Sequence, residues 1–330
     1  MIGKMCRIVL MPLVILVAVG IGTASAQDAV VVQLNWVHDS SFAGFYMAED
    51  MGLYEAQGLS VDLQIAFDEE GNFRDSVSEV ASGSAQFGVA DSATLLQARA
   101  DGIPVVAIAS NFQRNPLGFV SLAEQDILTP DDLVGKTVAI SEYNVFMFEA
   151  LLAVYDIDPS EVNIVERLDY TTAPLVSGEV DVIDAWVTNE MSTLDAQGIE
   201  ANAIFPFEYG VDMYPDVLFT SEEVIENNPE LVEAFLAATL AGIQMSVDDP
   251  DTAAEHVLSR DENFNIEELS VALSRAVPFF SPAGNPPGMM DSETWDVAQD
   301  VMLDTGVLEA ETDLESAFTL AFLNAIYGEN

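Results

Sequence analysis

The chain has 330 residues, of which 56 are Asp or Glu and 9 are Lys or Arg, so its formal net charge is −47. This charge excludes nucleic acid as a partner, because a phosphate backbone is bound through Lys and Arg side chains. Half of the residues are hydrophobic, and the length exceeds that of one ordinary core, so two lobes are expected.

The first 26 residues have the pattern of a secretory signal peptide. Lys4 and Arg7 precede an unbroken apolar run, and a small-x-small cleavage site follows it, ending at Ala26. We therefore expect cleavage after Ala26 and a periplasmic location. The only cysteine, Cys6, lies before the apolar run, so the exported protein would have neither disulfides nor thiolate chemistry.

The acidic excess is greater still beyond the signal peptide. That part of the sequence contains seven Lys or Arg and all 56 Asp or Glu, so its net charge is −49. Lys136 is its only lysine. One interpretation is a cationic ligand. The other is a solvated surface adapted to high salt, where screening removes the self-repulsion. Because the acids are spread along the whole chain, we favour the salt-adapted surface.

Strand and helix patterns alternate from residue 29 onward. Residues 29–36 form an apolar run typical of a buried strand, and residues 41–58 indicate a helix that is broken near Gly52 and stops at Gly58. Residues 59–66 alternate apolar and polar side chains, as a half-buried strand does. The next predicted elements are a helix over 73–83, a strand over 85–91, a helix over 92–102 with Ser92 as its N-cap, and a strand over 104–112.

The pattern restarts after a break near residues 122–132. The predicted elements there are strands over 136–141, 162–167 and 180–188, and helices over 144–157, 171–180 and 189–198. From about residue 214 a strand is followed by mostly helical sequence. Repeated β-α-β units imply mainly parallel sheets covered on both faces. We expect an α/β fold with one lobe formed by 27–120 plus 214–330 and the other by 121–213, joined by short crossover strands.

No catalytic set is evident. The chain has two histidines, and none of the patterns G-x-S-x-G, G-x-x-x-x-G-K-[ST] or H-E-x-x-H. We therefore predict no enzyme activity, no metal site and no cofactor. Ligands of open α/β sheets bind at the carboxyl ends of the strands, so those ends predict the binding residues.

The end of the first strand and the following helix give four candidates. Trp36 offers a flat apolar face with one N–H, and Asn35 offers a donor and an acceptor. Phe42, Phe45 and Tyr46 follow at spacing i, i+3, i+4, so at least one pair packs on the sheet. Phe42, in the first turn, is the better candidate for the cleft, and Tyr46 is kept as a second. The alternative for Trp36 is a place in the core.

Two further places in the first lobe supply polar candidates. Asp91 and Ser92 open a helix whose N–H groups could hold a ligand oxygen, and a simple capping pair is the alternative. Gln113 and Arg114 lie close to the predicted lobe junction. Arg114 stands out because cations are scarce, and its alternative is a salt bridge to one of the many acids.

In the second lobe, Asn144 begins a helix at a strand end, and Trp186, Asn189 and Glu190 surround another. A carboxylate beside an aromatic surface suits a flat heterocycle that bears N–H or amino groups. The alternative for Glu190 is an exposed first-turn acid favoured by the helix dipole. Tyr209, beside Phe207, precedes the predicted return to the first lobe.

Residues 34–63, LNWVHDSSFAGFYMAEDMGLYEAQGLSVDL, resemble the N-terminal signature of exported solute-binding proteins of ABC importers related to thiamine-pyrimidine synthase and to sulfonate-binding proteins. The matching positions are Leu34, Trp36, Gly44, Tyr46, Gly52, Tyr54, Gly58, Leu59 and Val61. The resemblance implies a type II periplasmic-binding-protein fold, with two α/β lobes that close on a ligand in the cleft. Members bind thiamine pyrimidine precursors, riboflavin, or small anions such as sulfonates, taurine and nitrate.

The fungal synthase branch of this family uses a histidine and a cysteine-rich segment. Here Phe42 stands where that histidine would be expected, and no cysteine follows Cys6. The resemblance therefore implies a monomeric binding protein that delivers a small flat N-heterocycle to an ABC permease and its ATPase at the inner membrane. The alternatives are a small-anion-binding protein that uses Arg114, a pyrimidine-synthesising enzyme, and an extracellular sensor component.

Overall fold

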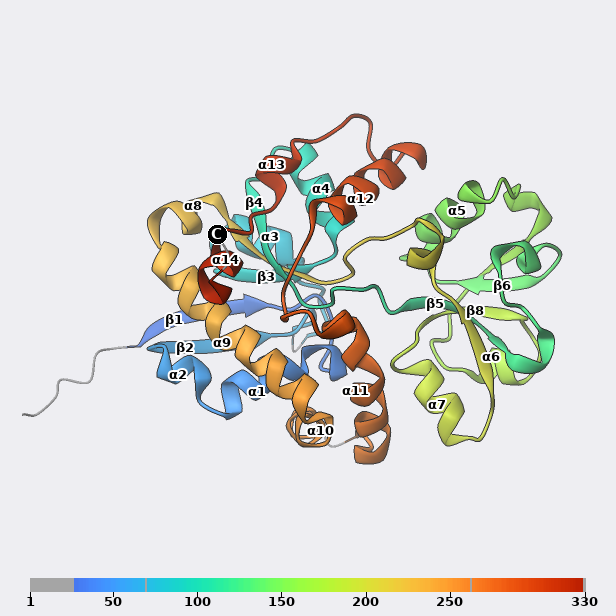
Figure 1. Cartoon of the computed structure of the whole chain (residues 1–330), viewed down its shortest axis with the longest axis horizontal. Coiled ribbons are helices and arrows are strands. Elements are labelled where there is room, and N and C mark those ends of the chain that lie inside the picture. The colour runs from blue at the N-terminus through green and yellow to red at the C-terminus, as the bar shows by residue number, and fades with distance from the viewer. Residues whose placement is uncertain (1–26, 69, 262, 329–330) are drawn as a thin grey trace, which may run out of the picture.

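The computed structural model describes residues 27–68, 70–261 and 263–328, so the predicted signal peptide lies outside the described residues. Two α/β lobes lie side by side, each built around its own five-stranded sheet (Figure 1). The two-lobed α/β fold expected from the sequence is therefore confirmed.

The sheet of the first lobe has the strand order β2-β1-β3-β10-β4. Its strands are β1 (Asp28–Gln33), β2 (Leu59–Gln64), β3 (Phe87–Ala90), β4 (Val105–Ser110) and β10 (Val217–Ser221). β1 runs parallel to β2 and β3, whereas β10 runs antiparallel to β3 and β4. The sheet is mixed because β10 enters it from the opposite end, when the chain returns from the second lobe.

The sheet of the second lobe has the order β7-β6-β8-β5-β9. Its strands are β5 (Leu117–Leu122), β6 (Thr137–Ile140), β7 (Asn163–Glu166), β8 (Val182–Trp186) and β9 (Ala201–Ile204). Sequence patterns did not assign β5 and β9, which pair with each other in antiparallel fashion. Because β5 belongs to this sheet, we place the crossing between β4 and β5, a few residues before the predicted boundary at 120.

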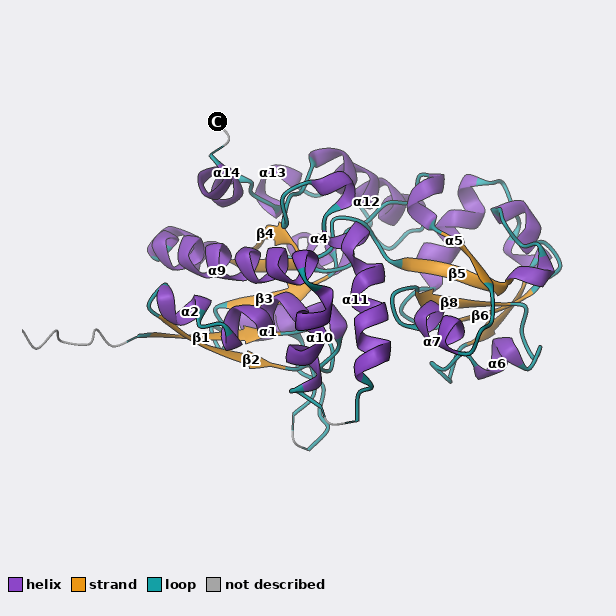
Figure 2. Ribbon diagram, turned by 60° about the horizontal axis from the view of Figure 1, so that its bottom comes forward, coloured by secondary structure: helices purple, strands orange, loops and turns teal. Residues whose placement is uncertain are grey.

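Helices cover both sheets (Figure 2). In the first lobe they are α1 (Ala43–Asp50), α2 (Leu53–Ala56), α3 (Ser76–Ala81), α4 (Ser92–Ala100), α8 (Glu222–Asn227), α9 (Pro229–Asp248), α10 (Pro250–Leu258), α11 (Ile266–Phe280), α12 (Ser292–Asp304), α13 (Leu314–Ala317) and α14 (Ala321–Tyr327). In the second lobe they are α5 (Val145–Val154), α6 (Ala173–Val176) and α7 (Glu190–Ala196). The break between α1 and α2 falls at Gly52, whose φ of 68° suits glycine. The N-cap of α4 is Asp91, which accepts from the N–H of Thr94, so the prediction that Ser92 caps this helix was wrong.

α1 and α9 pack against each other almost backbone to backbone. A Cβ on Gly242 of α9 would collide with the carbonyl oxygen of Gly44, and a Cβ on Gly44 would lie 2.8 Å from the Cα of Ile243. This contact explains why a glycine stands at position 44 beside three aromatic residues. α9 is long and apolar enough to pass as a membrane span by composition, but half of its most apolar window is buried inside the lobe.

Two segments cross between the lobes, one before β5 and one before β10. They are tied to each other, because the side-chain amide of Asn115 donates to the carbonyl oxygen of Met213 at 3.2 Å, and Arg114 forms an ion pair with Asp212. The C-terminal part of the chain returns to the first lobe. There Trp295 of α12 is fully buried and stacks on Phe318 with ring centroids 5.2 Å apart.

Candidate ligand-binding cleft

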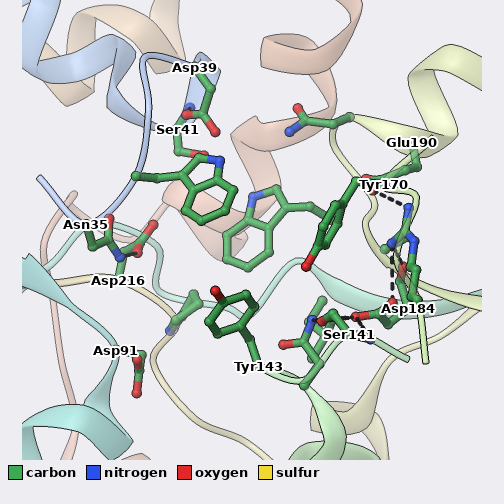
Figure 3. A pocket seen from close by; sticks show the side chains of 18 of the residues that line it. Asn35, Asp39, Ser41, Asp91, Ser141, Tyr143, Tyr170, Asp184, Glu190 and Asp216 are labelled. Atoms are coloured by element: carbon green, nitrogen blue, oxygen red, sulfur yellow. Dashed lines mark hydrogen bonds and ion pairs between the residues drawn. The ribbon is translucent and has the colours of Figure 1, made fainter. Parts of the chain in front are cut away.

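A cavity of about 1240 Å³ lies between the lobes and is lined by residues of both (Figure 3). Strand ends supply most of its wall, because the carboxyl ends of parallel strands face the same edge of a sheet. The segments after β1, β2 and β3 and the segment before β10 form the first-lobe wall. The loops after β6, β7 and β8 form the second-lobe wall. A ligand of several fused rings fits in this volume.

The first-lobe wall is acidic. Asp39, Asp91 and Asp216 line it, and the side-chain amide of Asn35 donates to Asp216 at 2.7 Å (Figure 3). Burial raises the pKa of Asp216 to about 8 and the pKa of Asp39 to about 6, because a carboxylate loses hydration there. This wall therefore favours a ligand that brings hydrogen-bond donors or positive charge.

A buried ion-pair network forms the second-lobe wall. Arg167, directly after β7, contacts the carboxylate of Asp184 on β8 at 3.3 Å and that of Glu190 at 3.1 Å. Asp184 also accepts from the hydroxyl of Ser141 and the amide of Asn144, both at 2.6 Å. Burial raises the pKa of Glu190, and the neighbouring Arg167 partly opposes this rise. The guanidinium of Arg167 is thus fully engaged by carboxylates and backbone carbonyl oxygens of its own lobe.

Aromatic side chains surround the opening of the cleft. Trp36 is 42% exposed, and on the second lobe Tyr143 and Tyr170 are 62% and 51% exposed. Trp186, deeper in the wall, meets Phe112 of the crossing segment edge to face at 5.8 Å. Exposed aromatic rings that converge on one cavity are suited to stacking on a flat ligand.

Three side-chain atoms of the cleft wall are buried without a hydrogen-bond partner. They are the amide oxygen of Asn35, the indole N–H of Trp186 and one carboxylate oxygen of Glu190. An unpaired buried polar group costs about 1–3 kcal/mol. A ligand that pairs these two acceptors and one donor on entering the wall recovers that free energy.

The structure brings eight of the thirteen predicted site residues together. The cavity is lined by Asn35, Trp36, Phe42, Asp91, Asn144, Trp186, Asn189 and Glu190. The hydroxyl of Ser40 on the first lobe also contacts the amide oxygen of Asn189 on the second at 3.3 Å, so the two walls meet at this point. The predicted residues that line the cavity thus come from both lobes.

Two of the other five predicted residues lie in the core of the first lobe. Tyr46 is fully buried behind the cleft wall, where its hydroxyl contacts the Nδ1 of His38 at 2.9 Å and Arg260 stands 4.6 Å from its ring. Ser92 is also fully buried, because it forms the first turn of α4 inside the lobe. Helix packing accounts for both positions.

The remaining three predicted residues have partners outside the cavity. Gln113 donates to the carbonyl oxygens of Phe280 and Pro286, and so fastens the crossing segment to the C-terminal region. Arg114 pairs with Asp212 at the crossing. The ring of Tyr209 meets that of Tyr155 at 5.4 Å on the second lobe. The salt bridge considered as the alternative for Arg114 is the arrangement that the structure shows.

Sequence reasoning missed four groups that shape the site: Arg167, Asp184, Asp216 and Tyr170. Arg167 follows a predicted strand directly, so the strand-end rule could have found it. Asp184 lies within β8, and Asp216 lies on the return crossing, whose position depends on pairing with distant strands. Nothing local in the sequence distinguishes these two from the many other acids.

Two α/β lobes with a cleft between them are the architecture of the type II periplasmic-binding-protein fold. The NMT1/THI5 like family matches residues 39–253, and the chain belongs to this family.

Among curated proteins, the chain is 28% identical to the riboflavin-binding protein RibY of Chloroflexus aurantiacus, across 89% of this chain and 86% of that one. It is 30% identical to the formylaminopyrimidine-binding protein of Halalkalibacterium halodurans, across 82% and 83%. It is 25% identical to the 4-amino-5-hydroxymethyl-2-methylpyrimidine phosphate synthase of Legionella pneumophila, across 78% and 82%.

Among solved structures, the periplasmic aliphatic sulphonate binding protein SsuA of Escherichia coli superimposes with a TM-score of 0.69 at 13% identity, covering 91% of this chain and 99% of that one. At this identity the likeness shows the fold alone.

Proposed function

We propose that this protein captures a flat N-heterocycle, neutral or positively charged, and delivers it to the permease of an ABC importer. The observation that carries the proposal is the charge of the cleft. Within the described residues, Arg167 is the only Lys or Arg that lines it, and two carboxylates already occupy its guanidinium. On the opposite wall, the cavity is lined by four aspartates, Asp39, Asp75, Asp91 and Asp216.

This charge distribution argues against a small anion such as a sulfonate, taurine or nitrate. An anion needs a free cation or several free N–H groups, since desolvating it is costly otherwise. Arg114, the cation that an anion site would use, is paired with Asp212 away from the cavity.

A flat heterocycle fits the same wall better. Its ring can stack on the aromatic side chains at the opening, its amino groups can donate to Glu190 and Asn35, and a ring nitrogen or carbonyl can accept from Trp186. The relatives named for binding riboflavin and formylaminopyrimidine support this class of ligand. The large cavity accommodates either a single pyrimidine with water or a fused ring system.

Isothermal titration calorimetry of the protein that starts at Gln27 tests the proposal. We expect binding of riboflavin or formylaminopyrimidine and none of taurine or nitrate. Substituting Glu190→Gln should weaken binding by about tenfold or more, because a charge-assisted hydrogen bond is replaced by a neutral one. Glu149→Gln, an exposed position on α5, is the matched control and should bind like the wild type. Binding of the anions but of neither heterocycle would overturn the proposal.

The remaining features of the proposal concern the setting in which the protein acts. They are export through residues 1–26, a periplasmic location, a monomeric state, and partnership with a permease and its ATPase. The signal-peptide pattern of residues 1–26 supports the export and the periplasmic location. A binding protein rather than a synthase is supported by Phe42 in the cleft wall and by the lack of any cysteine after Cys6. Size-exclusion chromatography with light scattering should give the mass of a monomer.

A further inference from the structure

Helix α11 belongs to the first lobe but stands at the boundary between the lobes (Figure 2). Its C-terminal end is fixed to the crossing segment, because the carbonyl oxygen of Phe279 accepts from the N–H of Gln113 at 2.8 Å. The ring of Phe280 stacks on Phe112 at 4.2 Å, and the ring of Phe279 lies 5.9 Å from Phe205 of the second lobe. This end of α11 therefore lies against the segment that crosses between the lobes and against the second lobe.

Arg275 lies one helical turn before Phe279 and on the same face of α11, since residues at i and i+4 are neighbours. Its guanidinium forms an ion pair with Asp195 of α7, and its Nε donates to the hydroxyl of Ser192 at 3.3 Å. Arg114 and Asp212 pair within the crossing itself. Among the described residues, the Arg275–Asp195 pair is the one that joins a helix of the first lobe to a helix of the second.

The helix that Arg275 holds is also the helix that carries cleft groups. α7 begins at Glu190, and Asn189 directly before it contacts Ser40 on the opposite wall. A displacement of α7 away from α11 therefore carries both side chains away from the first-lobe wall.

Both lobes carry a strong negative charge, so the Arg275–Asp195 contact lies between two parts of the molecule that repel each other. Residues 116–213 contain two Lys and Arg against 19 acids, and the rest of the chain beyond residue 26 contains five against 37. Like charges drive the lobes apart when salt does not screen them. A cation placed between the lobes offsets that repulsion at the point of contact.

We propose that Arg275 is a positioning residue for ligand binding: from the first lobe it holds α7 in place and favours the conformation in which the two cleft walls face each other. The inference rests on the proposed function only where ligand affinity is measured. The first experiment below needs no ligand.

The separation of the lobes can be measured directly, because the protein beyond residue 26 has no cysteine of its own. Spin labels on Val37→Cys and Leu168→Cys, two exposed positions that each adjoin a lining residue, report the distance across the cleft by double electron–electron resonance. Arg275→Gln should shift the distance distribution to longer values in low salt. Arg99→Gln is the control, because Arg99 pairs with Glu222 inside the first lobe.

A charge swap separates the ion pair from any general effect of substitution. Arg275→Asp alone and Asp195→Arg alone should each lengthen the distance, and the two together should restore it. An unchanged distribution in Arg275→Gln, or a swap that fails to restore the distance while the protein stays folded, would overturn the proposal.

Ligand affinity gives a second readout with riboflavin as the probe, or formylaminopyrimidine if riboflavin does not bind. In low salt, Arg275→Gln should bind about two- to fivefold more weakly than the wild type. The difference should shrink in molar salt, whereas loss of a merely structural contact would persist. A loss that is equal at both salt concentrations contradicts the proposal. If neither probe binds the wild type, the proposed function fails and the spin-label distances still decide the role of Arg275.

Discussion

Asp216 is a buried acid in the cleft whose hydrogen-bond partner is the neutral amide of Asn35. Burial raises its pKa from the usual value near 3.8 to about 8, so the folded protein keeps a proton there that the unfolded chain releases. Burial also raises the pKa of Asp39, but only to about 6, so its folded form keeps a proton over a narrower range of pH. The raised pKa favours the protonated form of Asp216 when no ligand is bound, whereas a ligand that donates hydrogen bonds or carries positive charge would favour its ionised form.

A substitution that mimics the protonated form should change the pH dependence of folding. The folded state binds more protons than the unfolded state between about pH 4 and pH 8. The free energy of unfolding of the wild type therefore falls as the pH rises from about 4 to about 8, because ionising the buried Asp216 is costly. Asp216→Asn should therefore be more stable than the wild type at pH 8, by up to about 5 kcal/mol, and equally stable near pH 4. Urea unfolding of both proteins at pH 4.5, 6 and 8 measures this difference. Parallel curves would show that Asp216 is ionised in the folded protein.

At the scale of elements, the close packing of α1 on α9 fixes the first-lobe wall. α1 follows directly on the loop that carries Asn35, Trp36 and Asp39, so a shift of this helix moves the loop. The contact depends on two glycines, and each approaches the backbone of the opposite helix too closely for a side chain.

Adding a single methyl group at this contact should destabilise the lobe. Gly242→Ala forces a Cβ against the backbone oxygen of Gly44, and overpacking of this kind typically costs about 1–3 kcal/mol. Ala241→Ser, at the exposed neighbouring position, is the control and should change stability by less than about 0.5 kcal/mol. Thermal unfolding measures both. Equal melting temperatures for Gly242→Ala and the wild type would mean that the helices separate without cost.

The alternation of strands and helices could be read from the sequence because periodicity and capping are local properties. The ends of β1 and β8 accordingly pointed to Trp36 and Glu190. The arrangement of distant segments could not be read in this way. Asp216 reaches the cleft because β10 inserts between β3 and β4, and Tyr46 turns to the core because Arg260, more than two hundred residues later, packs on its ring. Such positions depend on long-range packing, which no short pattern records.

At the scale of the whole molecule, charge repulsion acts within each lobe as well as between them. Ion pairs offset little of it, because only seven Lys and Arg lie beyond residue 26. Compact states with a large net charge are stabilised when salt screens the repulsion. The salt-adapted surface expected from the sequence stays a prediction, which the salt dependence of unfolding tests.

We therefore expect the protein to melt at a higher temperature in concentrated salt. Raising NaCl from dilute buffer to 2 M, about a tenfold or larger increase in ionic strength, should raise the melting temperature by about 5 °C or more. KCl at the same ionic strength should have the same effect, since screening depends on ionic strength and not on the identity of the ion. A melting temperature that stays constant across this range would contradict the expectation.

The three tryptophans of the chain lie in three different environments. Trp295 is sealed in the core of the first lobe, Trp36 stands at the rim of the cleft with 42% of its surface in water, and Trp186 lies on the opposite wall. Closure of the lobes over a ligand would remove water from the last two indoles but not from the first. Their emission would then shift to shorter wavelength and become less accessible to quenching by acrylamide, while Trp295 serves as an internal reference. The protein would thus carry its own fluorescence signal for closure, without any added dye.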